Sequence, residues 1–320
     1  MHRTPDRRGR RPFAAPDVSV VIAALDAETT LGAQLEALAA ERPDLGFEVI
    51  VADNGSTDRT VAVALSFADR FDAITVIDAS ARRGVSAARN AALEQVRARK
   101  VLCCDADDVI GVGWIAAMAE ALDSTDVAAS SLHWFSGATP ADGLEARPQV
   151  PMNDTALYAP GGGCGLTRHA LDTLHGFDEV VETEDAELSF RAYAAGLTIT
   201  HVPDAVVYVR ERSTLRQLWR QHFRWGRADP DLWRKYGSVL PPQSRRDALI
   251  VWYCIVKRFP IVRTDEGRRE WVRLAAYRFG RLFGSVEHRH VVLGWSVAAG
   301  VAGAAGAALF ADGAAAALAI

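Results

Sequence analysis

The eight residues from Val101 to Asp108 read VLCCDADD, and they decide how the rest of the chain is interpreted. Four residues that suit a buried strand lead directly into the carboxylates of Asp105, Asp107 and Asp108. Because a buried strand does not carry such charge in its middle, the acids must lie where the strand ends and meets water or a cation. In an open α/β sheet the carboxyl ends of the strands form the ligand crevice, so the stretch predicts a site at that edge.

Asp105 and Asp107 are close enough in sequence to act together. An Asp-x-Asp spacing places both carboxylates on the same side of an extended segment, where they can share one hard divalent cation. The alternative is a solvated turn that caps a helix, which is the usual role of an isolated Asp-x-Asp. Asp108 is interpreted as a charge at a helix N-terminus. The choice between a cation site and a turn depends on the rest of the chain.

Strands and helices alternate at short spacing around this stretch. The sequence predicts strands at 18–22, 48–52, 74–77 and 100–104, and helices at 30–40 and 86–97. This alternation is typical of a mostly parallel central sheet with flanking helices, so the fold class is α/β. Next come a helix at 114–122, a strand at 127–134 and a long loop at 136–160 that includes no predicted strand. A glycine-rich segment at 161–165 precedes two helices, at 168–174 and from Glu184 to Gly196. A strand pair, 198–202 and 205–209, follows around a Pro203-Asp204 turn.

Length and charge set the limits of the chain. Its 320 residues suit one domain of about 200 to 250 residues plus an extension, and a net charge of -4 gives no reason to expect a nucleic-acid partner. We expect a disordered basic arm at 1–15, the main domain at 16–237, a helical basic extension at 238–290 and an apolar, Ala- and Gly-rich helix at 291–320. The cysteines lack zinc-ligand spacing and are expected to be buried in a reducing compartment: Cys103, Cys104, Cys164 and Cys254.

Residues 291–311 are free of charge over 21 positions, which is long enough to span a bilayer. Their Ala and Gly content makes insertion marginal, so a helix that lies on the domain or on a membrane surface is the open alternative.

Six motifs follow the first predicted strand in one order. They read DNGSTD at 53–58, RGVSAARN at 83–90, DADD at 105–108, GFDE at 176–179, TED at 183–185 and QHFRW at 221–225. Each motif is weak alone, but together they make residues 18–237 resemble the family 2 glycosyltransferases of the type A nucleotide-sugar fold. The resemblance implies an inverting enzyme that moves a sugar from a nucleotide diphosphate sugar to an acceptor hydroxyl.

The resemblance also implies roles for individual residues. Asp107 and Asp105 would hold Mg²⁺ or Mn²⁺ against the diphosphate, with Asp105 also near the ribose. Glu28, Asp53 and Arg83 follow strand ends, where family members hold the base and ribose of a UDP- or GDP-type donor. For Asp53 the alternative is an Asx-turn or helix cap.

Asp185 is the predicted catalytic base, which would accept the proton of the acceptor hydroxyl during one inverting displacement. Its alternative role, shared with Glu184, is to cap the helix that begins there. Gln221, Arg224 and Trp225 match a motif typical of polysaccharide synthases: the Trp face can stack on a sugar, and the guanidinium can bind diphosphate. We therefore assign Glu184, Gln221 and Trp225 to acceptor binding and Arg224 to donor binding.

Two departures from the family pattern stand out. The loop 23–28 lacks the frequent Pro and Tyr, and Val209 occupies the place of a His that many members use, so Arg210 or Arg224 is expected to supply positive charge instead. A sugar-phosphate nucleotidyltransferase and a catalytically silent membrane-associated binding protein are the alternative functions. The expected partners are the nucleotide sugar and a glycan or lipid acceptor, at the cytoplasmic face of the cell membrane, with membrane contact through 291–311.

Overall fold

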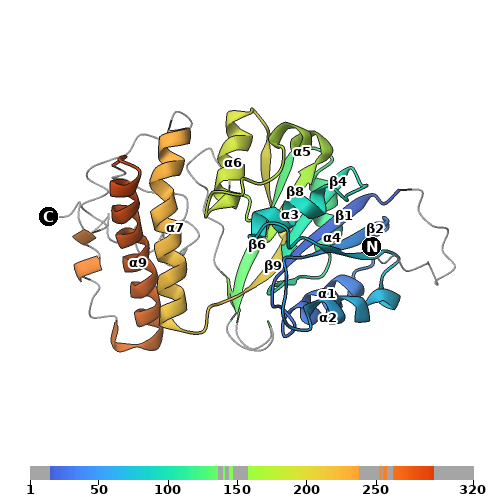
Figure 1. Cartoon of the computed structure of the whole chain (residues 1–320), viewed down its shortest axis with the longest axis horizontal. Helices are drawn as coiled ribbons and strands as arrows, with labels where there is room; N and C mark the ends of the chain where they lie inside the picture. Colours follow the sequence, from blue (N-terminus) through green and yellow to red (C-terminus); the bar gives the residue numbers. More distant parts are fainter. Residues whose placement is uncertain are drawn as a thin grey trace. The chain divides into compact units, whose positions relative to one another are not determined.

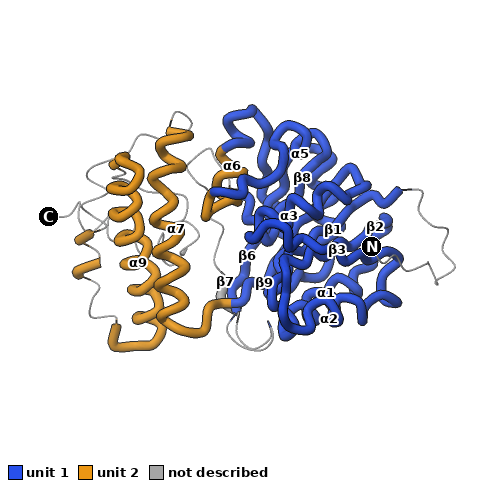
Figure 2. The backbone as a smooth tube through the Cα atoms, viewed as in Figure 1, with its two compact units in different colours: residues 1–146, 159–180, 191–210 blue, residues 147–158, 181–190, 211–320 orange. Residues whose placement is uncertain are grey.

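The computed structural model describes residues 15–135, 140, 144–146, 158–237, 252–253, 255–257 and 262–291. The chain forms two compact units, each discontinuous in sequence (Figure 2). The first comprises residues 1–146, 159–180 and 191–210, and the second comprises 147–158, 181–190 and 211–320. The domain boundaries expected from the sequence stay a prediction.

Four parallel strands form the first half of the sheet in the first unit (Figure 1). Their spatial order is β3-β2-β1-β4, and their bounds are β1 Val18–Ala24, β2 Phe47–Asp53, β3 Ile74–Asp78 and β4 Lys100–Asp105. The connections between them contain α1 (Leu31–Ala40), α2 (Thr60–Ser66), a short 3-10 helix (Ala68–Arg70) and α3 (Val85–Leu93). Helix α3 ends earlier than predicted, but the α/β fold class is confirmed.

Beyond β4 the sheet becomes mixed. The order continues β4-β8-β6-β9-β5, with β7 (Leu144–Ala146) paired to β6 (Val127–Phe135). β8 (Gly163–Thr167) runs antiparallel to both β4 and β6, and β9 (Ile199–Arg210) is parallel to β6 and antiparallel to β5 (Val109–Ile110). The fold class therefore holds, with its parallel part concentrated in the first four strands.

Two sequence predictions in this half are wrong: the loop expected at 136–160 contains the short strand β7, and the expected strand pair is a single strand. The strand pair expected around Pro203-Asp204 is one continuous strand, β9, whose register against β6 shifts between Ser130 and Ser131. Such an irregularity takes up the extra residues and the proline, which cannot donate a ladder hydrogen bond. The glycine-rich segment, for which no strand was predicted, also contributes a strand, β8. Glycine suits this strand because a Cβ at Gly165 would lie 2.9 Å from the Leu102 side chain and 3.0 Å from that of Leu122.

The core of the first unit lies between the sheet and helices α1 and α4 (Trp114–Ala121). Leu31, Leu35 and Leu38 lie at helical spacing on one face of α1, and all three are fully buried. Each such side chain contributes roughly 1.5 to 3 kcal/mol of burial free energy. Cys103, Cys104 and Cys164 are buried free thiols, and burial raises the pKa of Cys104. The fourth predicted core cysteine, Cys254, lies outside the described residues.

The second unit contains α7 (Leu215–Tyr236) and α9 (Asp265–Glu287), which pack side by side (Figure 1). Thr214 and Gln217 form a capping box that begins α7. Glycines allow the two backbones to approach closely: a Cβ at Gly226 would overlap the carbonyl oxygen of Tyr277, and one at Gly280 would overlap that of Phe223. Helix α9 confirms the expected helical C-terminal extension, whereas α7 precedes residue 238, where that extension was expected to begin.

The ends of the chain were predicted as a basic arm at 1–15 and an apolar helix at 291–320, and almost all of these residues lie outside the described part. The same holds for most of the predicted loop at 136–160. Among the described residues, the structure contains no helix that is both long enough and apolar enough to cross a membrane.

Candidate active site

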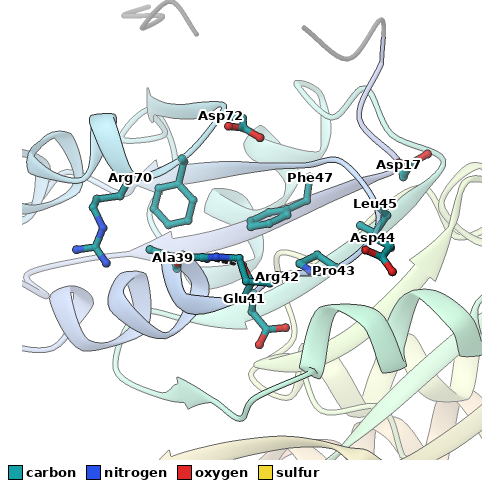
Figure 3. Close-up of a pocket in the computed structure, with 11 residues that line it drawn as sticks. Asp17, Ala39, Glu41, Arg42, Pro43, Asp44, Leu45, Phe47, Arg70 and Asp72 are labelled. Carbon is teal, nitrogen blue, oxygen red and sulfur yellow. Dashed lines mark hydrogen bonds between the residues drawn. The ribbon is translucent and has the colours of Figure 1, made fainter. Parts of the chain in front are cut away.

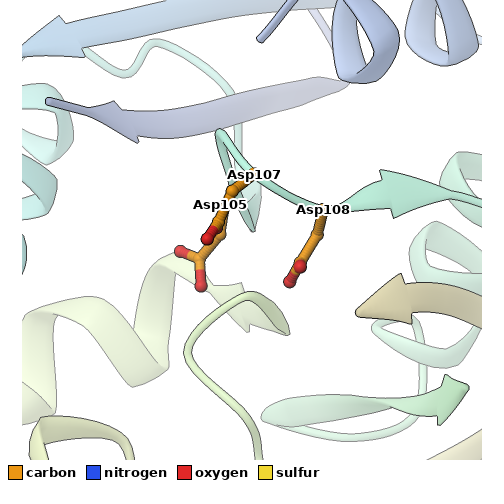
Figure 4. Close-up of side chains that lie close together, drawn as sticks. All are labelled: Asp105, Asp107 and Asp108. Atoms are coloured by element: carbon orange, nitrogen blue, oxygen red, sulfur yellow. The ribbon is translucent and has the colours of Figure 1, made fainter. Parts of the chain in front are cut away.

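Three carboxylates gather where β4 ends (Figure 4). Asp105 is the last residue of β4, and Asp107 and Asp108 belong to the turn before β5. One oxygen from each of the three lies within 4.8 Å of the others. Because β1, β2 and β4 are parallel and in register, Asp53 and Asp105 both flank the end of β1, opposite Ala24 and Ala23. The acids therefore lie at the sheet edge that the sequence predicted.

Asp105 is held by an arginine that the sequence analysis did not single out. The Nη2 of Arg89, on α3, lies 2.6 Å from Oδ1 of Asp105. The Arg89 side chain is 2% exposed and that of Asp105 is 32% exposed. The guanidinium also lies over the Phe177 ring, 5.1 Å from its centre. The only local signal was a long cation in a helix of small residues, RGVSAARN, where it has to pair to be buried.

Asp108 has a structural role that differs from the predicted one. It is 6% exposed, and helix α4 begins only at Trp114, so it is no charge at a helix N-terminus. Its Oδ1 instead accepts a hydrogen bond of 3.0 Å from the backbone N–H of Arg210. The Nε of Arg210 donates to the carbonyl oxygen of Asp107 at 3.3 Å, and its guanidinium lies over Phe135. The end of β9 therefore fixes the acidic turn.

The donor set of this cluster fits a hard divalent cation. All three ligand candidates are carboxylates, which Mg²⁺ and Mn²⁺ prefer. Arg89 and the Arg210 backbone orient Asp105 and Asp108 from behind, as outer partners orient metal ligands in known sites. Gly162 brings backbone against the Asp105 carboxylate, where any side chain would collide with it. Asp105 and Asp107 are both only partly buried, so a cation could reach them.

The predicted nucleotide contacts lie in polar turns of the same unit. The Asp53 carboxylate accepts from the Ser56 N–H at 3.3 Å, and the Glu28 carboxylate accepts from the Arg59 N–H at 3.0 Å. The Asp53 bond fits the alternative Asx-turn or cap interpretation of that residue, and the Glu28 bond joins two loops; neither tests a role in binding. Although burial opposes it, hydrogen bonds from Thr60 and from the Glu28 N–H hold the pKa of Asp58 below its usual value.

Arg83 lies in the exposed loop between β3 and α3, and the Asn54 side chain forms hydrogen bonds with the backbone of this loop. The Asn54 Nδ2 donates to the carbonyl oxygens of Ala79 and Arg82, at 2.7 and 2.8 Å, and its Oδ1 accepts from the Gly84 N–H at 2.8 Å. Asn54 is 3% exposed, so its side-chain amide has a structural role: it stabilises the conformation of the loop that contains Arg83.

The predicted base belongs to the second unit. Asp185 lies in the first turn of α6 (Glu184–Ala194), together with Glu184 and Glu187. The hydroxyl of Tyr158 donates to Oδ2 of Asp185, a contact that no local pattern could reveal. Glu187 is 2% exposed and accepts from the Tyr236 hydroxyl at 2.5 Å. Asp185 thus keeps partial exposure, whereas its neighbour is enclosed.

The QHFRW motif lies on α7 in the same unit. Arg224 is exposed, while Gln221 and Trp225 are half-buried. The Trp225 ring lies 4.8 Å from that of His222, whose Nδ1 is 3.0 Å from the Leu218 carbonyl oxygen. The structure therefore groups the predicted residues in two sets: Asp105 and Asp107 in the first unit, and the Asp185 and Gln221 motifs in the second.

A pocket of about 440 Å³ lies elsewhere in the first unit and is lined by residues that include Asp17, Arg42 and Phe47 (Figure 3). Phe47 begins β2 and Asp17 precedes β1, so the pocket is at the amino ends of the strands. Ligands of open α/β sheets bind at the carboxyl ends. Arg42 is also held by the carbonyl oxygens of Ala39 and Glu41. The acidic edge is therefore the stronger candidate.

Comparison with known families agrees with this geometry. Residues 19–160 match the family model of Glycosyl transferase family 2, and residues 100–256 match that of Glycosyl transferase family group 2. The two matches together span residues 19–256, and the chain belongs to the family 2 glycosyltransferases. This result favours glycosyl transfer over the nucleotidyltransferase and silent-binding alternatives.

Individual relatives are distant. A probable glycosyltransferase of Bacillus subtilis, YdaM, is 25% identical over 234 residues, which are 67% of this chain and 55% of that protein. A β-monoglucosyldiacylglycerol synthase of Nostoc sp. is 25% identical over 256 residues, 75% of this chain and 53% of that protein. The chain therefore spans about half the length of these curated relatives.

A solved structure shares the fold. This structure is the mannosyltransferase PcManGT from Pyrobaculum calidifontis in complex with GDP-Man and Mn²⁺. The two structures superpose with a TM-score of 0.53 at 19% sequence identity, and the alignment covers 98% of this chain and 83% of the PcManGT chain. At this identity the likeness supports the type A fold alone.

Proposed function

We propose that this protein is an inverting glycosyltransferase that moves a sugar from a UDP- or GDP-type donor to an acceptor hydroxyl by metal-assisted single displacement. The observation that carries the proposal is the cluster of Asp105, Asp107 and Asp108 at the carboxyl ends of parallel strands, in a chain of this family. Asp105 and Asp107 would hold Mg²⁺ or Mn²⁺. When bound, the cation neutralises the charge that develops on the departing diphosphate.

Asp53, Glu28 and Arg83 are the proposed contacts to the nucleotide, with Asp105 also near the ribose. The two carboxylates can accept from base or ribose donors, and their existing hydrogen bonds to Ser56 and Arg59 pre-orient them. Arg224 is exposed on α7 and is proposed to bind the diphosphate, since a guanidinium pairs with phosphate oxygens in a bidentate manner.

Asp185 is the proposed catalytic base. Its carboxylate would accept the proton of the acceptor hydroxyl while that oxygen forms a bond to the anomeric carbon and the bond to the diphosphate oxygen breaks. One displacement on the opposite face inverts the configuration. The Tyr158 hydroxyl bonds to Oδ2 of Asp185 and would fix the orientation of the carboxylate.

The acceptor is proposed to be a glycan or a lipid of the cell envelope, bound by Glu184, Gln221 and Trp225. Trp225 offers an aromatic face for a sugar ring, and Gln221 offers both a donor and an acceptor. A relative named for glucosyldiacylglycerol synthesis supports an acceptor of this class. We place the reaction at the cytoplasmic face of the cell membrane, with residues 291–311 as a further membrane contact.

Donor hydrolysis and transfer, measured with a panel of nucleotide sugars, test the proposal. We expect Mn²⁺-dependent activity in the wild type, loss of activity with a chelator, and a decrease of about 100-fold or more in Asp107→Ala. Asp123→Ala is the matched control, because that carboxylate is 70% exposed and pairs with Lys100 away from the cluster. Metal-independent activity that Asp107→Ala leaves intact would contradict the proposal.

A further inference from the structure

Large apolar side chains are exposed together on the second unit. On α9 they recur at helical spacing, so that they form one outward stripe. We define the aromatic face as the α9 stripe and the tryptophans next to it: Trp219, Trp252, Phe279, Leu282, Phe283 and Val286. Phe283 is 60% exposed and Val286 is 75% exposed.

These side chains form one continuous surface. The Phe279 ring lies 6.1 Å from that of Trp219 and 5.6 Å from that of Trp252. On the next turn, Phe283 lies 5.6 Å from Phe223 of α7. Isolated exposed apolar residues are normal, but a contiguous group of this kind marks a surface that contacts an apolar partner.

The packing of α7 against α9 leaves the α9 stripe exposed. Glycines fill the contact between the two helices, with Gly226 against the Tyr277 backbone and Gly280 against the Phe223 backbone. At so close an approach no side chain fits at the glycine positions themselves. The apolar side chains of the α9 stripe lie away from these glycines, and the described residues cover them only in part.

Arginines border this face. Arg216 and Arg220 are exposed on α7. Arg220 directly follows Trp219, so the two side chains are separated by about 100° around the helix axis. Helix α7 carries six basic and two acidic residues. Tryptophans beside arginines suit the headgroup region of a membrane, where the ring enters the interface and the cation meets a phosphate.

The charges also distinguish between candidate partners. Residues 292–320 include one acidic side chain, Asp312, and so offer little complement to the arginines. A second copy in a two-fold contact would place the same arginines opposite each other. Anionic lipid headgroups supply the missing negative charge. In addition, the uncharged stretch 291–311 begins four residues after α9 ends at Glu287.

We propose that the aromatic face is the surface through which this protein lies on an anionic membrane. The apolar side chains enter the headgroup–acyl boundary, and Arg216 and Arg220 contact lipid phosphates. The inference does not depend on the proposed donor chemistry, so either can fail without the other.

Flotation of the full-length protein with phosphatidylcholine vesicles, with and without phosphatidylglycerol, tests this surface. We expect the wild type to prefer the anionic vesicles. The variant Leu282→Ser/Phe283→Ser should bind these vesicles at least about tenfold more weakly than the wild type. Arg216→Gln/Arg220→Gln should lose about 30-fold in binding to anionic vesicles and little in binding to neutral ones. Val112→Ser is the control, an apolar residue that is 98% exposed in the first unit.

Both double variants change exposed side chains, and circular dichroism with thermal unfolding checks that they fold. Unchanged flotation of Leu282→Ser/Phe283→Ser would overturn the proposal, because another surface would then hold the membrane. A wild type that is dimeric by light scattering and becomes monomeric in that variant, with equal vesicle binding, would also overturn it in favour of a second copy.

Discussion

Two aspartate–arginine pairs of nearly equal length have different surroundings in the two units. Asp105 lies 2.6 Å from Arg89 in the first unit, and Asp229 lies 2.7 Å from Arg281 in the second. The Asp105 side chain is 32% exposed, whereas both members of the second pair are 3% exposed. A carboxylate that is partly open can take a second cation, while an enclosed one can act only on the fold. Exposure, and not the ion pair itself, distinguishes a candidate site from a structural contact.

Two residues of α9 near the enclosed pair, Tyr277 and Arg278, are also buried, and their pKa values are shifted. Burial raises the pKa of Tyr277 well above its usual value, and the charge of Asp229 adds to this effect. Burial, with the charge of Arg281, lowers the pKa of Arg278 to about 10. The α7–α9 contact thus contains buried charges, and each depends on oppositely charged neighbours for its stability.

The largest effect is expected at the proposed base. Asp185→Asn keeps the size of the side chain and removes its ability to accept a proton, so transfer should fall about 10² to 10⁴-fold. Donor affinity, measured by calorimetry with UDP or GDP, should stay unchanged. Glu182→Gln, an exposed acid three residues earlier, is the control. An Asp185→Asn enzyme with wild-type turnover would exclude this residue as the base.

Breaking the enclosed pair should cost stability. Asp229→Asn removes the carboxylate charge beside the buried Arg281 guanidinium, which is expected to lower the free energy of unfolding by about 3 to 5 kcal/mol. Urea denaturation measures it. The double variant Asp229→Leu/Arg281→Met removes both charges and should recover most of the loss. A single variant as stable as the wild type would show that water reaches this pair.

Breaking the open pair should cost less stability and more activity. Arg89→Met fills the same buried space and leaves Asp105 to be solvated, so the unfolding free energy should fall by less than in Asp229→Asn. The carboxylate loses its orienting partner, and we expect transfer to fall about 10 to 100-fold. Steady-state kinetics at several Mn²⁺ concentrations should show that part of this loss is recovered at high Mn²⁺. If stability falls as far as in Asp229→Asn, the distinction between the two pairs is wrong.

Asp108 should behave as a structural residue beside the site. Asp108→Asn retains an oxygen for the Arg210 N–H but loses the charge, so a decrease of about 1 kcal/mol in unfolding free energy is expected. Transfer should change by less than about tenfold. A loss of transfer as large as that of Asp107→Ala would instead make Asp108 a metal ligand.

The smallest effect is a pH dependence from His201. Burial lowers its pKa below 6.5, so the unfolded chain takes up the proton at a higher pH than the folded chain does. The free energy of unfolding should therefore fall as the pH is lowered from neutral to about 5. In His201→Gln this slope should be shallower, as measured by urea denaturation at each pH. An equal slope in both proteins would place the titrating group elsewhere.

Much of the fold followed from local sequence pattern. The apolar runs of β1, β2 and β4 and the Leu31, Leu35 and Leu38 face of α1 are signals that a window of a few residues contains. β8 was missed because glycine disfavours strands, and its need for glycine comes from Leu102 and Leu122 on other elements. Similarly, a Pro-Asp pair usually predicts a turn, and only the partner strand β6 shows that it lies within β9.

The site was predictable to the same extent. The position of Asp105 and Asp107 at a strand end is local, and the structure agrees with it. The partners of the acids are not local: Arg210 is about 100 residues from Asp108, and Tyr158 is 27 residues from Asp185. Such pairings depend on the fold, so the sequence identified the acids, and named Arg210 only as a source of positive charge, but it did not identify which residues orient the acids.

Binding of Mn²⁺ tests the central claim most directly, because the claim is that the open carboxylates hold a cation for the diphosphate. Electron paramagnetic resonance can titrate Mn²⁺ into the wild type, Asp107→Asn and the control Asp123→Asn, with and without UDP or GDP. We predict that one nucleotide tightens Mn²⁺ binding in the wild type and the control, and that Asp107→Asn binds it at least about tenfold more weakly. Equal Mn²⁺ affinity in all three proteins, with either nucleotide present, would contradict the account.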